Sequence, residues 1–193
     1  MRCIVFLGNP GREYEKTRHN VGRRLIDALS FAKEVPWNSK FKGRYAQAPP
    51  PYRATLLLPE TYMNKSGESV GACLRFLKIE PKDLTVAHDD LELPFGTIDV
   101  RIGGGLGGHN GLRSIVSAIG TKEFARLRIG ISRPRHGDAA SYVLGRFDPD
   151  EESVLPLILG ATARVVEDIL RSGPSAVSQS VSRRVVVVEK PRT

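Results

Sequence analysis

A short apolar run near the start of the sequence, Ile4-Val5-Phe6-Leu7, is followed at once by Gly8-Asn9-Pro10-Gly11. The run is typical of a buried strand, and the glycines and proline after it predict that the strand ends in a loop. A helix should follow, because apolar residues recur at helical spacing between 21 and 32 and Asn20 can cap the first turn. Strand, loop and helix in this order favour an α/β fold, whose open sheet binds ligands at the carboxyl ends of its strands. We therefore expect functional side chains between residues 8 and 20.

Strand and helix signals alternate along the rest of the chain. Further strands are predicted at 44–48, 53–58, 84–87, 97–102 and 124–131. Helices are predicted from the turn that holds Ser69 to about 77, at 112–119 and at 139–144, with a long one from 149 to about 171. The strand at 97–102 alternates polar and apolar residues, as a half-exposed strand does. At least one hairpin-like pair is present, so we predict one α/β domain with a mixed sheet over residues 1–180, followed by a basic tail at 181–193.

The chain is basic, with a formal net charge of +8 and a sequence pI near 9.8. This charge favours a polyanionic partner such as nucleic acid, although many basic proteins bind nothing anionic. No apolar run approaches the ~20 residues that span a bilayer, and no secretory signal precedes the first strand. We therefore expect a cytoplasmic protein with no membrane partner. Cys3 and Cys73 lie in a strand and a helix pattern, which predicts reduced cysteines in the core.

A glycine-rich segment, Gly103-Gly104-Gly105-Leu106-Gly107-Gly108, precedes the helix at 112–119. Its glycine spacing matches the dinucleotide-binding fingerprint, which would imply a nicotinamide or flavin cofactor. The strand before it is polar at every second residue, however, whereas the first strand of such a site is buried on both faces. The number of glycines also exceeds what a phosphate needs and indicates a mobile loop. A dinucleotide cofactor is therefore the weaker interpretation.

A second motif, Gly67-Glu68-Ser69-Val70-Gly71, matches the nucleophile elbow of serine hydrolases, with Asp89 and His109 following in the usual order. The elbow requires a strand that runs directly into the serine, whereas the preceding strand ends well before, at Leu58. Ser69 is instead predicted in the first turn of a helix. A serine esterase remains an alternative, which loss of activity in Ser69→Ala would support.

Histidines in loops beside carboxylates raise the possibility of a metal site. His19, His88 and His109 all lie in such positions. None of them shows the spacing of a zinc-binding helix, and neither cysteine lies near them in the sequence. We expect no metal ion.

Amides and titratable side chains recur instead at the ends of predicted strands and loops, namely Asn9, His19, Asn64, Asp89, His109 and Asn110. These loops gather on one rim if the strands are parallel. His19 can then act as a general base, with Asp89 fixing its tautomer and stabilising the imidazolium. Asparagine side chains can donate to a developing oxyanion. Because no nucleophilic serine or cysteine is convincingly placed, water should attack, and we expect hydrolysis of an ester or amide on an anionic carrier.

These residues belong to segments in which the chain closely resembles the bacterial-type peptidyl-tRNA hydrolase family. The likeness covers about residues 1–150 in family order and weakens in the last helix. It includes Leu7-Gly8-Asn9-Pro10-Gly11, Tyr14, Thr17-Arg18-His19-Asn20, Thr61-Tyr62-Met63-Asn64, His88-Asp89-Asp90-Leu91, Gly107-Gly108-His109-Asn110-Gly111 and Arg126-Leu127-Arg128-Ile129-Gly130. The resemblance implies a three-layer fold of the phosphorylase/hydrolase-like type, with a twisted mixed sheet flanked by helices. It also implies a monomeric cytoplasmic enzyme that uses no metal or cofactor.

The activity implied by the resemblance is cleavage of the ester between a peptide and the terminal ribose of tRNA. Among the catalytic residues, His19 would activate water, Asp89 would orient His19, Asn9 would hold the substrate near its ester, and Asn110 would position the water and the carbonyl. The substrate-binding residues, which would contact the acceptor stem, terminal adenosine and peptide, would be Tyr14, Tyr62, Asn64, His109, Gly107, Arg101, Arg128 and Arg133. Residues 103–108 and 139–144 would form a mobile rim.

Small departures from the family pattern occur at Phe6, Lys65 and Glu92, and none removes a proposed catalytic group. A further alternative is a non-catalytic RNA-binding relative on the same fold. The intact set of His19, Asp89 and the asparagines argues against it, and a hydrolysis assay would decide.

Overall fold

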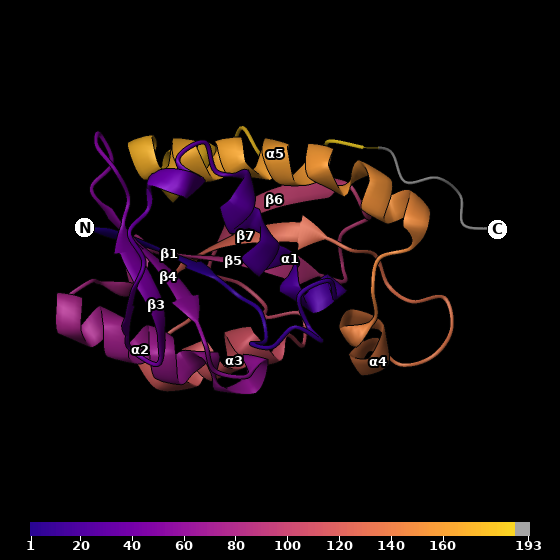
Figure 1. Cartoon of the computed structure of the whole chain (residues 1–193), viewed down its shortest axis with the longest axis horizontal. Helices are drawn as coiled ribbons and strands as arrows, with labels where there is room; N and C mark the ends of the chain where they lie inside the picture. Colours follow the sequence, from indigo (N-terminus) through magenta and orange to yellow (C-terminus); the bar gives the residue numbers. More distant parts are fainter. Residues whose placement is uncertain (188–193) are drawn as a thin grey trace.

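The computed structural model describes residues 1–187 of the chain, and its described residues form one mixed sheet of eight strands between layers of helices (Figure 1). The strands are β1 (Arg2–Phe6), β2 (Asn38–Lys40), β3 (Gly43–Gln47), β4 (Ala54–Pro59), β5 (Leu84–Asp90), β6 (Thr97–Ile102), β7 (Ala125–Gly130) and β8 (Arg184–Val185). The α-helices are α1 (Val21–Arg24), α2 (Ser66–Leu77), α3 (Asn110–Ile119), α4 (Ala139–Leu144), α5 (Pro149–Ser172) and α6 (Pro174–Ser178). Short 3-10 turns lie at Arg18–Asn20, Leu25–Ala28, Ala32–Glu34, Met63–Lys65 and Pro81–Asp83.

The order of the strands is β2-β3-β4-β1-β5-β7-β6-β8. The four central strands, β4, β1, β5 and β7, are parallel, and the strands on either side of them are antiparallel to their neighbours. The central strands are buried almost throughout, as strands covered on both faces should be. Their carboxyl ends therefore meet at one edge, where the loops after β1, β4 and β5 lie together.

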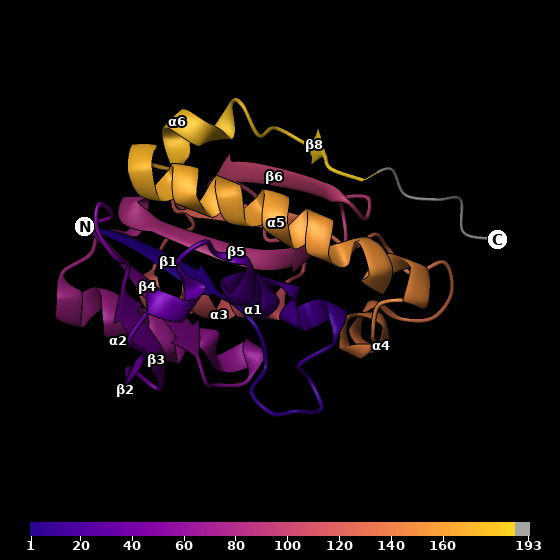
Figure 2. The same cartoon turned by 45° about the horizontal axis from the view of Figure 1, so that its top comes forward.

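Alternate residues of β1 point to opposite faces and join two separate cores. Ile4 and Phe6 pack in the core beneath α1, α5 and α6, whereas Cys3, Val5 and Leu7 pack in the core beneath α2 and α3. Figure 2 shows α5 on one face of the sheet and α2 and α3 on the other. The predicted three-layer α/β fold with a mixed sheet is confirmed, and both cysteines are buried and free.

Several local predictions need correction. The helix expected over 21–32 is broken into α1 and two 3-10 turns, and the Asn20 side chain does not cap it because it binds the peptide groups of Asn9 instead. The segment 97–102 is not half-exposed, because Asp99 is buried and neutralised by Arg128. β5 also continues through His88, Asp89 and Asp90, which were expected in a loop.

The predicted tail at 181–193 is not separate over its described part. Val181 is buried against the core, and β8 pairs with β6 at the edge of the sheet (Figure 2). The basic residues Lys190 and Arg192 lie outside the described residues. None of the described helices has the length and apolar character needed to cross a membrane.

Candidate active site

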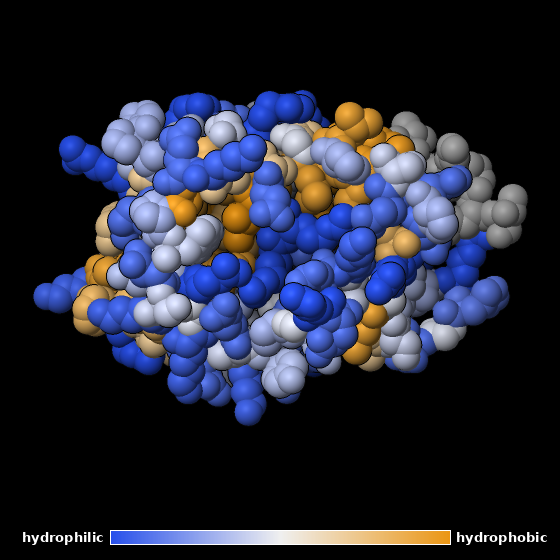
Figure 3. Space-filling model, viewed as in Figure 1, coloured by the Kyte–Doolittle hydropathy of each residue, from blue (hydrophilic) through white to orange (hydrophobic). Residues whose placement is uncertain are grey.

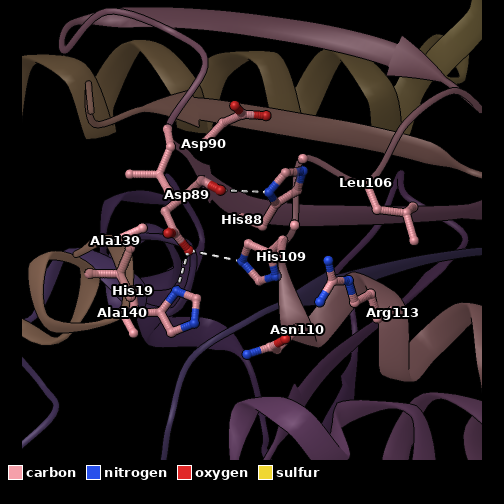
Figure 4. A pocket seen from close by; sticks show the side chains of 14 residues that line it. His19, His88, Asp89, Asp90, Leu106, His109, Asn110, Arg113, Ala139 and Ala140 are labelled. Atoms are coloured by element: carbon pink, nitrogen blue, oxygen red, sulfur yellow. Dashed lines mark hydrogen bonds and ion pairs between the residues drawn. The ribbon is translucent and has the colours of Figure 1, made fainter. Parts of the chain in front are cut away.

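A cavity of about 280 Å³ opens at the carboxyl end of β5, between α4 and the start of α3 (Figure 4). Side chains from four parts of the chain line it, because β5, the 3-10 turn before α1, the glycine-rich loop and α4 all end or turn there. The lining residues include His19, His88, Asp89, Gly107, His109, Asn110, Arg113, Ala139, Ala140 and Val143. The sequence prediction that polar groups from distant loops gather on one rim is therefore confirmed for His19, Asp89, His109 and Asn110.

The glycine-rich loop reaches this rim by an unexpected route. β6 runs antiparallel to β7, so the loop begins at the opposite edge, where the Gly103 amide donates to the carbonyl of Phe124. It then runs back along the sheet and delivers His109 to Asp89 at the end of β5. On the way, the buried guanidinium of Arg126 donates to the carbonyl oxygens of Gly103 and Gly105. The loop is thus held through its carbonyls, which is the opposite of a phosphate cradle made of amide groups.

One carboxylate oxygen of Asp89 joins two imidazoles. Its Oδ1 accepts hydrogen bonds from His19 Nδ1 at 2.8 Å and from His109 Nε2 at 3.0 Å (Figure 4). Asp89 is only 2% exposed, so water does not compete for this oxygen. The three side chains form a fixed unit at the floor of the cavity.

The start of α3 settles the tautomer of His109, and the hydrogen bond to Asp89 settles that of His19. His109 caps this helix, since its Nδ1 accepts from the backbone amides of Gly111 at 3.1 Å and Leu112 at 3.4 Å. A neutral imidazole has one N–H, so the proton of His109 lies on Nε2 and points to Asp89. His19 likewise donates from Nδ1 and keeps a lone pair on Nε2, which has no hydrogen-bond partner among the described residues.

The electrostatics of this unit match a general base with an ionised partner. Burial lowers the pKa of the His19 imidazole, but the charge of Asp89 and its hydrogen bond raise it by more, so the pKa lies above its ordinary value. Burial raises the pKa of Asp89, but the two histidines outweigh it and hold the pKa well below its usual range. Asp89 is therefore an anion at neutral pH, and it stabilises a proton arriving on His19.

His88 lies beside this unit but has a different character. Its Nδ1 lies 2.7 Å from the carbonyl oxygen of Asp89 and donates to it, whereas its Nε2 is buried with no hydrogen-bond partner among the described residues. Burial, followed by the nearby His109, lowers the pKa of His88 to about 3. His88 therefore stays neutral under all ordinary conditions.

The donor atoms of His19, Asp89 and His109 lie within 4.8 Å of one another, which is close enough to suggest a metal ion. A metal would need the lone pair on His109 Nε2, where the proton lies. Moving that proton to Nδ1 would point it at the amide groups of Gly111 and Leu112. The donor set is therefore arranged for hydrogen bonds and does not fit a metal.

Asn9 lies next to the cavity but does not line it. Its Oδ1 accepts from the amide of Met63 at 2.7 Å, and its own peptide groups bind the side chain of Asn20 at 2.8 and 2.9 Å. Sequence reasoning missed this role of Asn20, because an asparagine before a helix is usually a cap. Asn9 thus joins the loop after β1 to the loop after β4, and only its Nδ2 remains as a donor.

Three other predicted substrate residues lie outside the cavity, on the loops that Asn9 joins. Tyr14 and Tyr62 meet edge to face with ring centroids 6.4 Å apart, and Tyr62 is 56% exposed. Asn64 is exposed and lies in the 3-10 turn before α2. None of these three side chains, here termed the outer rim, lines the cavity.

The predicted phosphate-binding arginines differ in their availability. Arg128 is 7% exposed and lies between Asp90 Oδ2 at 2.7 Å and Asp99 Oδ2 at 2.6 Å, so it cannot reach a phosphate. The side chains of Arg101 and Arg133 are more than half exposed, each with one carboxylate partner. Arg113, which sequence reasoning did not select, lines the cavity and has no ion pair among the described residues. Its place one turn after Asn110 on α3 was the signal that could have identified it.

Ser69, the alternative nucleophile, does not belong to this site. It is fully buried within α2, does not line the cavity, and its hydroxyl has no partner among the described residues. A nucleophile elbow would need it at a sharp strand-to-helix turn with a histidine in reach. The serine-esterase interpretation has no support from this geometry.

Comparison with known proteins gives one consistent answer. The family model described as peptidyl-tRNA hydrolase matches residues 3–188. A peptidyl-tRNA hydrolase of Pelobacter propionicus is 45% identical over 92% of this chain and 94% of its own length, and one of Chloroflexus aurantiacus is 48% identical over 90% and 94%. The crystal structure of peptidyl-tRNA hydrolase from Acinetobacter baumannii superposes with a TM-score of 0.88 at 34% identity, covering 97% of both chains. The chain therefore belongs to the peptidyl-tRNA hydrolase family.

Proposed function

We propose that this protein hydrolyses the ester bond between a peptide and the terminal ribose of tRNA, using water activated by His19. The observation that carries the mechanism is the arrangement of His19 itself. Its Nδ1 is tied to a buried carboxylate at 2.8 Å, while its Nε2 has no hydrogen-bond partner within residues 1–187. The described residues that line the cavity include no serine or cysteine. A base so placed can take a proton only from a small molecule in the cavity, and water is the simplest.

The reaction balances with the groups at hand. Water loses a proton to His19 Nε2 as its oxygen attacks the ester carbonyl, and Asp89 stabilises the resulting imidazolium. The Nδ2 groups of Asn110 and Asn9 are the amide donors available to the developing oxyanion. The imidazolium then returns the proton to the departing ribose oxygen, which leaves a free carboxylic acid on the peptide and a hydroxyl on tRNA.

Substrate binding is proposed to involve the outer rim and the unpaired cation at the cavity. Tyr14 and Tyr62 offer aromatic faces for the terminal adenosine, and Asn64 lies beside them for the peptide. Arg113 and the exposed side chains of Arg101 and Arg133 are candidates for phosphate contacts along the acceptor stem. Hydrophilic side chains dominate the face shown in Figure 3, and the net charge of +8 suits a polyanionic substrate.

The proposed active form is a monomer. The proposed place of action is the cytoplasm, where translation supplies peptidyl-tRNA. Light scattering at assay concentrations would test the monomer.

The experiment compares N-acetyl-aminoacyl-tRNA with free aminoacyl-tRNA as substrates of the wild-type chain. We expect cleavage of the N-blocked ester. In His19→Ala, turnover should fall about 10²–10⁴-fold, because general-base catalysis is lost, while tRNA binding is retained. Ser69→Ala is the matched control and should keep wild-type turnover. Full activity in His19→Ala, or inactivity in Ser69→Ala with an intact fold, would contradict the proposal.

A further inference from the structure

One wall of the cavity is only lightly anchored, because Tyr142 and Val143 of α4 pack against the core beneath α5 without being buried in it. Ala139, Ala140 and Val143 of α4 line the cavity, yet no residue of this six-residue helix is buried. Glycines flank it at 137 and 145, and Gly137 has a φ of 83°. A short helix with so little apolar burial has a low local stability of its own. Its position must depend on specific contacts with the rest of the molecule.

Tyr142 donates its hydroxyl to the carbonyl of Ile131 at 2.7 Å, and Arg18, the residue immediately before His19, makes a further set of these contacts. Its backbone amide donates to the carbonyl of Gly145 at 2.9 Å, and its Nη1 donates to the carbonyl of Arg146. Its Cζ lies 4.2 Å from the ring centroid of Tyr142, so the guanidinium stacks on the helix. Arg18 is only 5% exposed, and these contacts are therefore shielded from water.

The remaining nitrogen of the fork connects Arg18 to α5. Nη2 lies 2.8 Å from Oε2 of Glu151, and both side chains of this pair are less than a tenth exposed. The same carboxylate oxygen accepts the amide of Asp148 at 2.9 Å, which fixes the start of α5. The segment from α4 to the first turn of α5 is thus tied to one guanidinium.

We propose that Arg18 is a positioning residue that sets the distance between the α4 wall and His19. Because Arg18 and His19 are adjacent in the chain and share one 3-10 turn, the wall and the base form a single unit. The inference rests on the proposed function for its kinetic consequence, but the tether itself is a property of the fold. The planar fork, which binds a carbonyl and a carboxylate while it stacks on a ring, is specific to arginine.

Arg18→Lys tests this proposal, because lysine keeps the charge but has neither the fork nor the flat face. We expect the KM for N-acetyl-aminoacyl-tRNA to rise about 10-fold and kcat to fall less than about 3-fold. The acid limb of the pH–rate profile should stay in place, because the His19–Asp89 pair is unchanged. Hydrogen exchange at the amides of Tyr142 and Gly145 should become faster, since α4 is less firmly held.

Arg24→Lys is the matched control. Arg24 pairs with Glu152, the next residue of α5, at 2.5 and 3.1 Å, and its side-chain hydrogen bonds go to no other described residue. This variant should leave KM and exchange in α4 at wild-type values. A second variant, Glu151→Gln, keeps the size of the side chain and should also speed exchange in α4. Wild-type KM and exchange in folded Arg18→Lys would overturn the proposal. If the wild-type chain cleaved no peptidyl-tRNA, the proposed function would fail, and the exchange data alone would decide the role of Arg18.

Discussion

Asp89 illustrates how a single oxygen can set the chemistry of two neighbours. Because Oδ1 accepts from both His19 and His109, the second ring nitrogen of each imidazole carries no proton and can accept a hydrogen bond. His109 presents its acceptor to a helix end, and His19 presents its acceptor to the cavity. The two histidines are chemically identical in the sequence, and only their second hydrogen bond makes one of them structural and the other a candidate base.

The pH dependence of the reaction follows from this arrangement. As a base, His19 must be neutral, so kcat/KM should rise with pH through the pKa of His19, which lies above its ordinary value. Replacing Asp89 by asparagine removes the anion that stabilises the imidazolium. The acid limb should then move to lower pH, and the plateau should fall.

The measurement is a pH profile of kcat/KM for both chains between pH 5 and 9, with substrate stability checked at each pH. An acid limb at the same pH in Asp89→Asn would show that a different group limits the rate.

Residues 9 and 20 show the limit of sequence reasoning at this scale. The meeting of His19 and Asp89 could be predicted, because both follow from the direction of parallel strands, whereas His109 and Asn110 reach the same cavity from a loop after the antiparallel strand β6. Which partner each one takes depends on distances across the fold. Asn20 therefore binds Asn9 instead of a helix end, and Arg128 is buried between two acids that are 38 and 29 residues away in sequence.

At the scale of elements, the close packing of α2 against α3 fixes the position of the amino end of α3 beside the cavity. Gly67 in the first turn of α2 lies against α3, and its amide donates to Ser114 Oγ at 2.9 Å. A Cβ at Gly67 would collide with the carbonyl oxygen of Ser114. Because α3 begins at Asn110 and is capped by His109, this close approach also holds in place two residues that line the cavity.

Gly67→Ala should therefore destabilise the protein by about 1–3 kcal/mol, as overpacking does, and lower activity along with it. Gly160→Ala is a matched control in the interior of α5, where an added Cβ meets nothing within 4 Å. That variant should gain about 0.5–1 kcal/mol, since alanine suits a helix better than glycine. Urea unfolding measures the free energy of unfolding of both variants. Equal stability of the two variants would show that α2 and α3 can move apart enough to accommodate the added methyl group.

Most strands and the longer helices could be predicted from the sequence, because their apolar residues repeat at a period that burial requires. The prediction failed where pairing with another strand decides the structure. β8 begins a run of valines that favours a strand, but this run falls in the predicted tail because its partner β6 is distant in the sequence. The short strand β2 carries no such run and depends on its pairing with β3.

For the whole molecule, His88 couples folding to pH. An unfolded histidine titrates near pH 6.5, whereas His88 in the fold has a pKa of about 3. A group whose folded pKa is depressed contributes its full stability above the unfolded value, and this is lost as the pH falls from about 6.5 towards 3. Between these two pH values His88 stays neutral in the folded protein, whereas it binds a proton in the unfolded chain.

His88→Gln should therefore be less sensitive to acid than the wild type. Between pH 7 and pH 4, the wild-type chain should lose on the order of 2–3 kcal/mol more of its free energy of unfolding than the variant. Urea titrations at the two pH values provide the comparison, and Asp89 and His19 titrate in both chains. Parallel losses in the two proteins would refute the role of His88.

The sheet ends on both sides in very short strands, three residues in β2 and two in β8. A long bare strand at a sheet margin invites the backbone of another molecule to pair with it. Here both margins offer few free peptide groups, and Lys40 and Arg184 add charges that repel a second copy. β8, the last strand in the described part of the chain, thus covers the end of β6 at this margin, and it should help to keep copies of the protein from pairing edge to edge.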